Sequence, residues 1–253
     1  MEISTQYGDE VGWIIFDRPE SRNAISKSMW DQIPVVLESL KTQGARVCVF
    51  RGAGGAFASG ADLAELEQLD SKEKATDQWL SIRNALNAVA RFELPVLAMI
   101  EGPCMGGGCL LAAACDLRYC SIGARFSVPV AQLGIKLDDD NIARILALVG
   151  KGRALELLMT GRIIDGARAE AIGLVNGVAE NSVELESLVL GACTDIKKNA
   201  PSALQHIKET VHKLAPQCLD QDQEAMVASY LSPEFRARVA RALDVHKKPR
   251  PPN

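Results

Sequence analysis

The chain has 253 residues, of which 47% are apolar and 24% are charged, and its formal net charge is −4. This length is enough for one large domain with a sizeable core, while the negative charge disfavours a general nucleic-acid binder because no broad basic field is present. The longest apolar runs are far shorter than a membrane span, and seven cysteines without a CxxC are typical of reduced, buried thiols in a cytoplasmic protein.

Short β-type runs alternate with helical segments in the first part of the chain. The runs cover residues 11–16, 46–50, 95–100, 116–120 and 125–130. After the first run, residues 28–41 predict a helix with one apolar face formed by Met29, Ile33, Leu37 and Leu40. Pro34 lies inside this segment, so we expect the helix to kink or to start late. The alternation of buried strands and helices predicts an α/β fold.

From about residue 141 the chain becomes helical. Residues 202–214 place an apolar stripe on one helical face, formed by Leu204, Ile207, Val211 and Leu214. The last, charged helix has a second stripe, formed by Phe235, Val239 and Leu243. We therefore expect an α/β core over residues 1–195 and a helical C-terminal region over residues 196–253.

Several familiar catalytic motifs are absent from the sequence. It has no GxxxxGK[ST] phosphate loop and no GxSxG elbow, and Phe57 replaces the last glycine that a dinucleotide loop would need. His206 and His212 lie away from the apolar stripe of their helix, which predicts solvated side chains. No cysteine–histidine cluster has zinc spacing. Nucleotide hydrolase, α/β-hydrolase and zinc-enzyme interpretations are therefore disfavoured, and we expect no metal.

Two glycine-containing turns, at residues 57–66 and 102–120, each follow a strand and lead towards a helix. The first N–H groups of a helix have no partners within the helix and carry the positive end of its dipole. One such N–H from each turn could hold a single oxygen, and each donor in an oxyanion hole is worth about 3–4 kcal/mol in the transition state. Close packing alone explains either turn taken singly, but the two turns together favour the oxyanion hole.

Four segments in sequence order resemble the crotonase (enoyl-CoA hydratase/isomerase) superfamily. They are FDRPESRNAIS, VFRGAGGAFASGADLAEL, IEGPCMGGGCLLAAACDLRYCSIGARFSVPVAQLGI and VGKGRALELLMTGRIIDGARAEAIGLVNGV. The resemblance extends from about residue 8 to residue 180. It implies a spiral of ββα turns with a helical C-terminal trimerisation region, an acyl-CoA thioester substrate, and a homotrimer or a hexamer built as a dimer of trimers.

The resemblance also implies positions for the binding residues. The oxyanion donors of the family correspond to the backbone N–H groups of Ala61 and Gly107. Its coenzyme A contacts correspond to Arg22, Ala24, Ser59, Asp62 and Leu63. Lys247 and Lys248 match a basic tail that can contact the phosphates of coenzyme A, although a solvated terminus explains them equally well. Coenzyme A would enter as part of the substrate, and no separate cofactor is expected.

Hydratases of this family use two glutamates, and both are replaced here. One position, three residues after the middle glycine, is Leu110, and the other is Val130. Hydration of an enoyl thioester needs a base that activates water and an acid that delivers the α-proton. Neither leucine nor valine can do this, so the standard mechanism with two glutamates is not supported.

Asp138, eight residues after Val130, is the best remaining candidate for a catalytic carboxylate. Its position matches the catalytic aspartate of dienoyl-CoA isomerases and the nucleophilic aspartate of 4-chlorobenzoyl-CoA dehalogenases, but this half of the chain lacks the histidine that would support a dehalogenase. Alternatively, Asp138 caps a helix that begins near Asn141. For the neighbouring Asp139 and Asp140 we expect capping or solvation.

Other polar side chains near the glycine turns have simpler interpretations. Asp116 is predicted to be a structural hydrogen-bonding acid, and Cys104 and Cys109 are predicted to be packing residues, although a thiol pKa can fall at a helix N-terminus. A solvated helix face is predicted for the acids after the first turn, of which one could point inwards: Glu65, Glu67, Asp70, Glu73 and Asp77.

A single carboxylate favours isomerisation, in which Asp138 moves a proton along an unsaturated acyl chain while Ala61 and Gly107 hold the enolate oxygen. The alternatives are enoyl-CoA hydration with an altered acid/base set, decarboxylation or thioester hydrolysis on the same scaffold, and acyl-CoA binding without catalysis. The sequence does not identify the acyl group, and fold resemblance alone does not choose among these functions.

Overall fold

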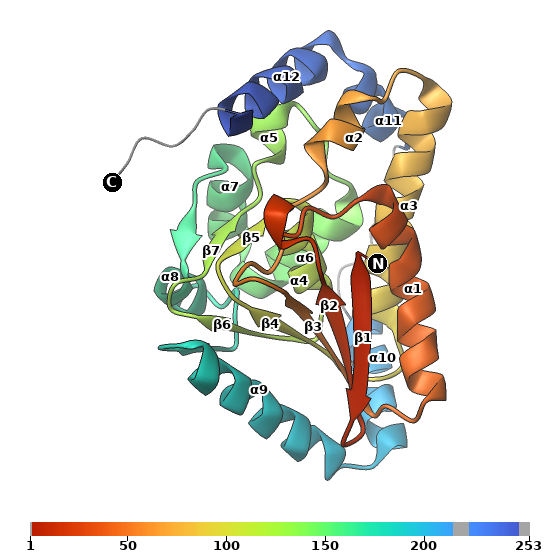
Figure 1. The fold of residues 1–253 in the computed structure, drawn as a ribbon, viewed down its shortest axis with the longest axis vertical. Coiled ribbons are helices and arrows are strands. Elements are labelled where there is room, and N and C mark those ends of the chain that lie inside the picture. The colour runs from red at the N-terminus through yellow and green to blue at the C-terminus, as the bar shows by residue number, and fades with distance from the viewer. Residues whose placement is uncertain (1, 215–222, 248–253) are drawn as a thin grey trace.

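The structure is a computed structural model that describes residues 2–214 and 223–247, with side chains described as far as residue 244 (Figure 1). Within this part of the chain a six-stranded sheet has the strand order β1-β2-β3-β4-β6-β9, and a small three-stranded sheet has the order β5-β7-β8. The strands are β1 (Ile3–Gly8), β2 (Val11–Phe16), β3 (Val47–Gly52), β4 (Val96–Ile100), β5 (Pro103–Met105), β6 (Leu117–Ser121), β7 (Arg125–Ser127), β8 (Ile164–Asp165) and β9 (Gly177–Ala179).

Helices surround the sheets and form most of the second half of the chain. They are η1 (Pro19–Ser21), α1 (Lys27–Thr42), α2 (Leu63–Glu67), α3 (Lys72–Arg91), α4 (Gly107–Ala114), α5 (Val130–Leu133), α6 (Asp139–Val149), α7 (Lys151–Thr160), α8 (Gly166–Ala171), α9 (Ser182–Lys197), α10 (Pro201–Leu214), α11 (Gln223–Leu231) and α12 (Pro233–Lys247). The predicted α/β class is confirmed.

The large sheet is buried on both faces because its central strands alternate between two apolar clusters. In β3, Cys48 and Phe50 face the main core, which includes side chains of α1, α3 and α4, while Val47 and Val49 face the cluster built with α9. Strands β2, β3, β4, β6 and β9 pair in parallel, and only β1 is antiparallel to its neighbour. Helix α9 lies beneath the sheet in Figure 1, and α2 and α12 lie at the opposite end of the molecule. This arrangement places the carboxyl ends of the strands towards α2 and α12.

Helix α1 follows its predicted apolar stripe and begins before Pro34 rather than late. Met29, Ile33, Leu37 and Leu40 are all buried. The helix runs from Lys27 through Pro34 without a break, so the expected late start is wrong. Its N-cap Ser26 accepts a hydrogen bond from the Met29 N–H at 3.2 Å. Because the buried stripe continues on both sides of Pro34, packing holds the helix together across the missing hydrogen bond.

The strand near residue 130 is shorter than predicted, and the apolar stripe of α10 is largely exposed. The expected strand at 125–130 ends at Ser127, because Pro129 stands at the N-cap of α5 and Val130 begins that helix. In α10 the predicted stripe exists but is not covered within the described chain: Ile207, Val211 and Leu214 are 59%, 62% and 80% exposed.

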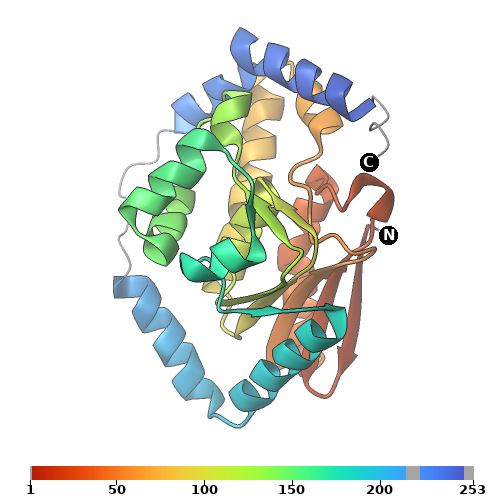
Figure 2. The same cartoon turned by 90° about the vertical axis from the view of Figure 1, so that its left-hand side faces the viewer.

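The stripe of α12 behaves as predicted, because Phe235 and Val239 are buried and Leu243 packs against the same cluster. Figure 2 shows α9 and α10 at one end of the molecule and α12 at the other. The boundary between an α/β core over residues 1–195 and a helical region over residues 196–253 remains a prediction.

Gly52, at the end of β3, is predicted to tolerate no side chain. A Cβ atom there would lie 1.8 Å from the Ala56 carbonyl oxygen and 2.6 Å from both Asn23 Nδ2 and the Phe57 carbonyl oxygen. The backbone of the following loop would have to move, so we expect Gly52→Ala to lower the free energy of unfolding by at least about 3 kcal/mol. Urea denaturation measures this loss. Gly191→Ala, where a Cβ atom meets nothing within 4 Å, is the control, and equal stability of the two variants would contradict the prediction.

Candidate active site

In the loop after β3, the backbone N–H of Ala61 points away from the neighbouring segment that contains Ile25. The Ile25 N–H donates to the Gly60 carbonyl at 2.7 Å, and the Asp62 N–H donates to the Ile25 carbonyl at 3.1 Å. Ile25 thus pairs with the residues on either side of Ala61 in an isolated parallel bridge. Because successive peptide groups of an extended segment point to opposite sides, the N–H of Ala61 points away from Ile25.

The second glycine turn connects β5 to α4 beside this loop. The Met105 N–H donates to the Ala58 carbonyl, and the Gly106 N–H donates to the Ser127 carbonyl, at 2.9 and 2.8 Å. Gly106 has a φ of +49°, a conformation that glycine adopts without strain. Gly107 is the first residue of α4, so its N–H has no acceptor within the helix.

The structure brings the two predicted donors, Ala61 and Gly107, together. A Cβ atom built on Gly107 would lie 3.5 Å from the Ala61 nitrogen and 3.0 Å from Cζ2 of Trp30. A side chain at this position would press on the buried ring of Trp30, so the close approach of α4 to Trp30 requires glycine. The arrangement can hold one oxygen between two backbone donors at the start of a helix, where the dipole favours negative charge.

The positions predicted to contact coenzyme A also gather around this loop. The Ser59 N–H donates to the Arg22 carbonyl at 2.9 Å, and the Ser59 hydroxyl donates to the Ser21 carbonyl at 3.0 Å. Arg22 is exposed, and Ala24, Ser59, Asp62 and Leu63 are half-buried. Two paired segments at the edge of the candidate site therefore carry these positions: Arg22, Ala24, Ser59, Asp62 and Leu63.

Arg18 connects these two segments, a role that the sequence reasoning missed. Its guanidinium donates to Asp62 Oδ2 at 3.0 Å and to the Ala24 carbonyl at 2.9 Å, and it forms an ion pair with Glu2 at 3.0 Å. The other Asp62 oxygen accepts the Ala64 N–H at 3.0 Å and caps α2. Arg18 thus holds the residue that follows Ala61. No motif in the sequence pairs positions 18 and 62, so only the three-dimensional contact shows this.

Asp138 is the one carboxylate that is buried among the residues with described side chains, with 7% of its surface exposed. It is the N-cap of α6: its Oδ1 accepts the Asn141 N–H and its Oδ2 accepts the Asn141 side-chain amide, both at 2.9 Å. Burial raises the pKa of the Asp138 carboxyl above its ordinary value of 3.8, although the hydrogen bonds from Asn141 and the charge of Arg144 oppose this rise. The capping prediction is confirmed.

Asp138 lies near Tyr230 of α11 and at the start of a helix that contacts α4. Its negative charge adds to the effect of burial in raising the pKa of Tyr230. Tyr230 belongs to the cluster against which Ala61 packs. On the other side, Leu137 packs against the core that contains Leu110, and α6 contacts α4. Asp138 therefore begins a helix that contacts α4, the helix whose first residue is Gly107.

The two positions of the missing glutamates are apolar and packed. Leu110 is buried, and Val130 packs half-buried against the same core. A carboxylate at Leu110 would be desolvated, and an unpaired buried charge is costly. The chain therefore has apolar, packed side chains at both positions where the resemblance implies glutamates in a hydratase.

Other acids beside the site have structural or solvated positions, as predicted. Glu67, Asp70, Glu73 and Asp77 are exposed. Glu65 is half-buried, and its carboxylate accepts the Lys27 N–H at 2.6 Å at the start of α1. The prediction for Asp116 is confirmed, because one of its oxygens accepts the Val96 N–H and the Lys208 ammonium, both at 2.7 Å. Through this ion pair, Lys208 connects α10 to the segment that precedes β6 in the sheet.

The thiols beside the glycines are inert packing groups, as predicted. Cys104 and Cys109 are buried. Burial raises the pKa of the Cys104 thiol well above its ordinary value, so it is not activated. His206 and His212 are exposed, as predicted. Lys248 and the side chain of Lys247 lie outside the described residues.

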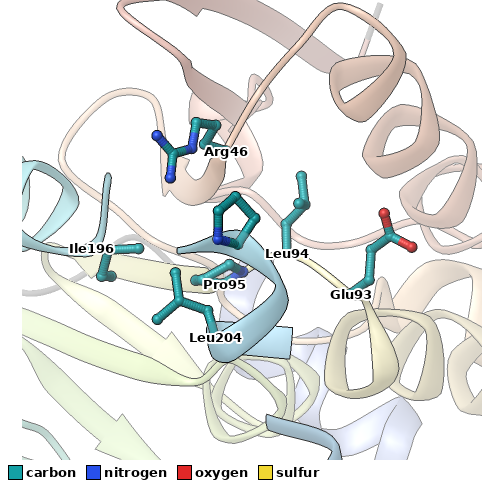
Figure 3. Close-up of a pocket in the computed structure, with 7 residues that line it drawn as sticks. Arg46, Glu93, Leu94, Pro95, Ile196 and Leu204 are labelled. Carbon is teal, nitrogen blue, oxygen red and sulfur yellow. The ribbon is translucent and has the colours of Figure 1, made fainter. Parts of the chain in front are cut away.

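A small pocket lies at the amino ends of β3 and β4, away from this site (Figure 3). It is lined by residues that precede β3 and β4 and by residues of α9 and α10: Arg46, Glu93, Leu94, Pro95, Ile196, Pro201 and Leu204. In the described chain, no group of three or more histidine, cysteine, aspartate or glutamate side chains could hold a metal ion. None of the helices described is long and apolar enough to cross a membrane.

Comparison with known proteins relates this geometry to a family. The profile of the enoyl-CoA hydratase/isomerase family matches residues 6–244. The chain is 33% identical over 207 residues to the peroxisomal Δ(3,5)-Δ(2,4)-dienoyl-CoA isomerase of Arabidopsis thaliana, covering 77% of this chain and 74% of that protein. It is 31% identical over 234 residues to the 2,3-dehydroadipyl-CoA hydratase of Escherichia coli, covering 92% and 87%. The solved structure of an enoyl-CoA hydratase/isomerase family protein from Hyphomonas neptunium matches with a TM-score of 0.81 at 30% identity, covering 97% of this chain and 95% of that one.

Proposed function

Because this chain belongs to the enoyl-CoA hydratase/isomerase family, we propose that it is an isomerase that shifts a double bond in the acyl chain of a CoA thioester, with Asp138 as the proton carrier. Membership supports the predicted crotonase-like fold and an acyl-CoA enzyme. The choice of isomerisation rests on one observation: in the described chain, Asp138 is the one buried carboxylate, while Leu110 and Val130 are apolar.

The proposed reaction moves one proton and consumes nothing. The Asp138 carboxylate takes a proton from one carbon of the acyl chain, and the electron pair of that C–H bond moves towards the thioester carbonyl. The N–H groups of Ala61 and Gly107 hold the resulting enolate oxygen. The Asp138 carboxyl then returns the proton to another carbon, the double bond forms at its new place, and the carboxylate is regenerated.

Burial suits Asp138 to this role. A carboxylate with a raised pKa is a stronger base than one in water, and general bases work best when their pKa approaches the working pH. The hydrogen bonds from Asn141 hold the carboxyl group at the start of α6. The relative with 33% identity that is named a dienoyl-CoA isomerase is in line with this chemistry.

Hydration is the second candidate, since a relative with 31% identity is named a hydratase. It would need Asp138 or Glu65 to activate water, and Glu65 is half-buried beside the first turn. Decarboxylation, thioester hydrolysis and acyl-CoA binding without catalysis remain alternatives on the same scaffold. Product analysis after deuterium exchange separates them.

The remaining parts of the proposal concern binding and assembly. The coenzyme A portion of the substrate would contact Arg22, Ala24, Ser59, Asp62 and Leu63. The reaction would need no separate cofactor. The exposed apolar stripe of α10 supports a homotrimer or hexamer, since such a surface is usually covered by a partner. The six described cysteines are free and buried, which suits a reducing compartment such as the cytoplasm.

Deuterium exchange in D2O, followed by NMR, tests the proposed reaction. Crotonyl-CoA and a 3-enoyl-CoA are incubated separately with the protein. Deuterium at the α or γ carbon together with a shifted double bond supports isomerisation. A hydroxyl group at the β carbon without isomerisation supports hydration instead, and free coenzyme A or CO2 indicates hydrolysis or decarboxylation. A bound ester without exchange or product contradicts a catalytic role with these substrates.

The pH dependence of this exchange follows from the environment of Asp138. A base must be ionised to accept a proton, and burial raises the pKa of this carboxyl above 3.8. We therefore expect kcat to fall as the pH drops through the raised pKa, with a midpoint above that of an exposed aspartate. Rates measured from pH 4 to pH 8 in buffers of constant ionic strength, at saturating substrate, give the midpoint. A kcat that is flat across this range would contradict Asp138 as the base.

A further inference from the structure

Asn141, in the first turn of α6, has a polar side chain that is almost completely buried, with 2% of its surface exposed. Its Nδ2 donates to Asp138 Oδ2, and its Oδ1 accepts from the Arg144 guanidinium, both at 2.9 Å. A buried polar group is costly unless it is hydrogen-bonded, and here both ends of the amide have partners. Asn141 therefore stands between the Asp138 carboxylate and a cation.

The Arg144 guanidinium bridges two asparagine side chains on different helices. Its Nη1 donates to Asn141 Oδ1 in α6, and its Nη2 donates to Asn87 Oδ1 in α3 at 2.5 Å. Arg144 and Asn87 are both half-buried. The planar guanidinium is thus held from two sides, and a continuous chain of hydrogen bonds runs from α3 to the Asp138 carboxylate.

Arg144 determines which way the Asn141 amide points, because a guanidinium has donors and no acceptor. Only the amide oxygen can face Arg144, so the NH2 group must face Asp138. The reversed amide would turn its oxygen towards the carboxylate and set two acceptors face to face. Since the Asn141 backbone N–H holds the other carboxylate oxygen, two donors of one residue orient the carboxyl group.

The charge of Arg144 also acts on Asp138. Burial raises the pKa of this carboxyl, and the hydrogen bonds from Asn141 and the charge of Arg144 oppose the rise. An opposite charge nearby favours the ionised form of a carboxyl group, and an arginine remains protonated at every pH at which the protein is folded. Arg144 therefore contributes both an orientation and a charge to the Asp138 carboxylate.

The other ionisable groups around this pair do not replace Arg144. Asp140, in the first turn of α6, raises the pKa of Asp138, and Arg91 of α3 acts on Arg144. The buried Tyr230 of α11 is uncharged at neutral pH, because burial raises its pKa. Helix α4 contacts α6 but has no charged side chain. The charged side chains of α7, which also contacts α6, are exposed or paired elsewhere: Lys151, Arg153 and Glu156.

We propose that Arg144 is a positioning residue for the reaction: through Asn141 it fixes the orientation of the Asp138 carboxylate, and its charge keeps that carboxylate ionised for proton transfer. This inference rests on the proposed function, because it needs Asp138 to be the base. A base contributes fully only when it is held in the geometry of the transfer, so losing the hold lowers kcat. A bridge between α3 and α6 with no role beyond packing would instead matter for stability and not for turnover.

Kinetics of Arg144→Met and Arg144→Lys test the two contributions separately. Methionine removes the charge and both hydrogen bonds, so we expect kcat for deuterium exchange at pH 8 to fall by about 10- to 100-fold, while KM changes by less than about twofold. The midpoint of the pH profile of kcat should move to higher pH, because removing a nearby cation raises the pKa of a carboxyl. Lysine keeps the charge but not the planar fork, so it should restore the midpoint and only part of kcat.

Arg91→Met is the matched control, because Arg91 is an exposed arginine of α3 whose charge acts on Arg144. It is not a member of the hydrogen-bonded chain from Asn87 to Asp138, so its kcat and its midpoint should equal those of the wild type.

A double-mutant cycle tests whether Arg144 acts through Asn141. Asn141→Ala removes the amide that connects Arg144 to Asp138 but keeps the backbone N–H that Asp138 Oδ1 accepts. We expect Asn141→Ala to lower kcat at pH 8 about as much as Arg144→Met does. Adding Arg144→Met to Asn141→Ala should then lower kcat by less than about twofold more, since residues of one network are not additive. Losses that multiply would contradict action through Asn141.

NMR of protein labelled with 13C-aspartate follows the Asp138 carboxyl without turnover, and the loss of its signal in Asp138→Asn assigns it. If the wild type exchanges deuterium but Arg144→Met keeps the wild-type kcat and midpoint, the inference fails and the isomerase proposal stands. If the wild type shows no exchange but the 13C midpoint rises in Arg144→Met, the hold on the carboxylate is supported and isomerisation is wrong. An unchanged 13C midpoint without exchange contradicts both. Should Arg144→Met fail to fold, Asn141→Ala decides, because a normal kcat in that variant overturns the inference.

Discussion

Asp138→Asn is expected to lower the rate of deuterium exchange into a 3-enoyl-CoA by about 10²- to 10⁴-fold, the usual contribution of a general acid or base. The amide cannot accept the proton at neutral pH, so both halves of the proton transfer stop. Asparagine is as good an N-cap as aspartate, and its oxygen can still accept the Asn141 N–H at the start of α6. The fold should therefore persist while the rate falls.

Asp139→Asn is the matched control, because Asp139 is the next acid along and lies in the first turn of α6. Its exchange rate should equal that of the wild type. Binding of the CoA ester to Asp138→Asn, measured by calorimetry, should also be unchanged. If Asp138→Asn retains its rate, then the base lies elsewhere and half-buried Glu65 becomes the next residue to test.

The pH dependence of the free energy of unfolding of Asp138→Asn gives a second test that does not depend on the reaction rate. Burial raises the pKa of Asp138 in the folded protein, so between pH 3.8 and that raised pKa the native state binds more protons than the unfolded state. The free energy of unfolding of the wild type should then decrease as the pH rises through this window. Asp138→Asn removes this contribution. Urea denaturation at several pH values should show a smaller decrease in the variant, and equal slopes would mean that the carboxyl is not desolvated.

Gly107→Ala is expected to give the second large effect, a decrease in kcat of about 10²- to 10³-fold, the usual cost of removing one donor from an oxyanion hole. The added methyl group would lie 3.5 Å from the Ala61 nitrogen and 3.0 Å from Cζ2 of Trp30. It would therefore press on the buried ring of Trp30 and displace the start of α4, and with it the Gly107 N–H. Deuterium exchange measures the rate, and thermal unfolding measures the accompanying strain, which we expect to be about 1–3 kcal/mol.

The contact with Trp30 makes a control for strain necessary. Gly123→Ala adds the same methyl group in the turn between β6 and β7, where it meets nothing within 4 Å, and its rate and stability should match the wild type. Variants that fold equally well can then be compared directly by kcat. A Gly107→Ala variant with normal kcat would contradict the location of the oxyanion hole between Ala61 and Gly107.

The local pattern of apolar residues was sufficient to predict the helices and strands that bury one face or both faces. The apolar stripe of α1 and the runs that became β2, β3 and β4 lie within a residue or two of their predicted positions, because burial imposes a fixed period on such segments. The same reasoning missed β1, whose residues after Ile3 are largely exposed, and the short β5, β8 and β9. It was also wrong about a late start of α1 at Pro34, because packing along the helix outweighed the local penalty of proline.

The amino-acid sequence by itself determined which chemical groups are available: two glycine turns before helices, apolar Leu110 and Val130, and an acid at Asp138 that can cap a helix. Each of these follows from the identity or spacing of nearby residues. Only the tertiary structure decided what the groups do together. It set the Ala61 nitrogen beside Gly107, joined Arg18 to Asp62, buried Asp138 and packed Trp30 against Gly107. These are contacts between segments far apart in the chain, and their geometry depends on how the sheet and its helices pack, which no local pattern encodes.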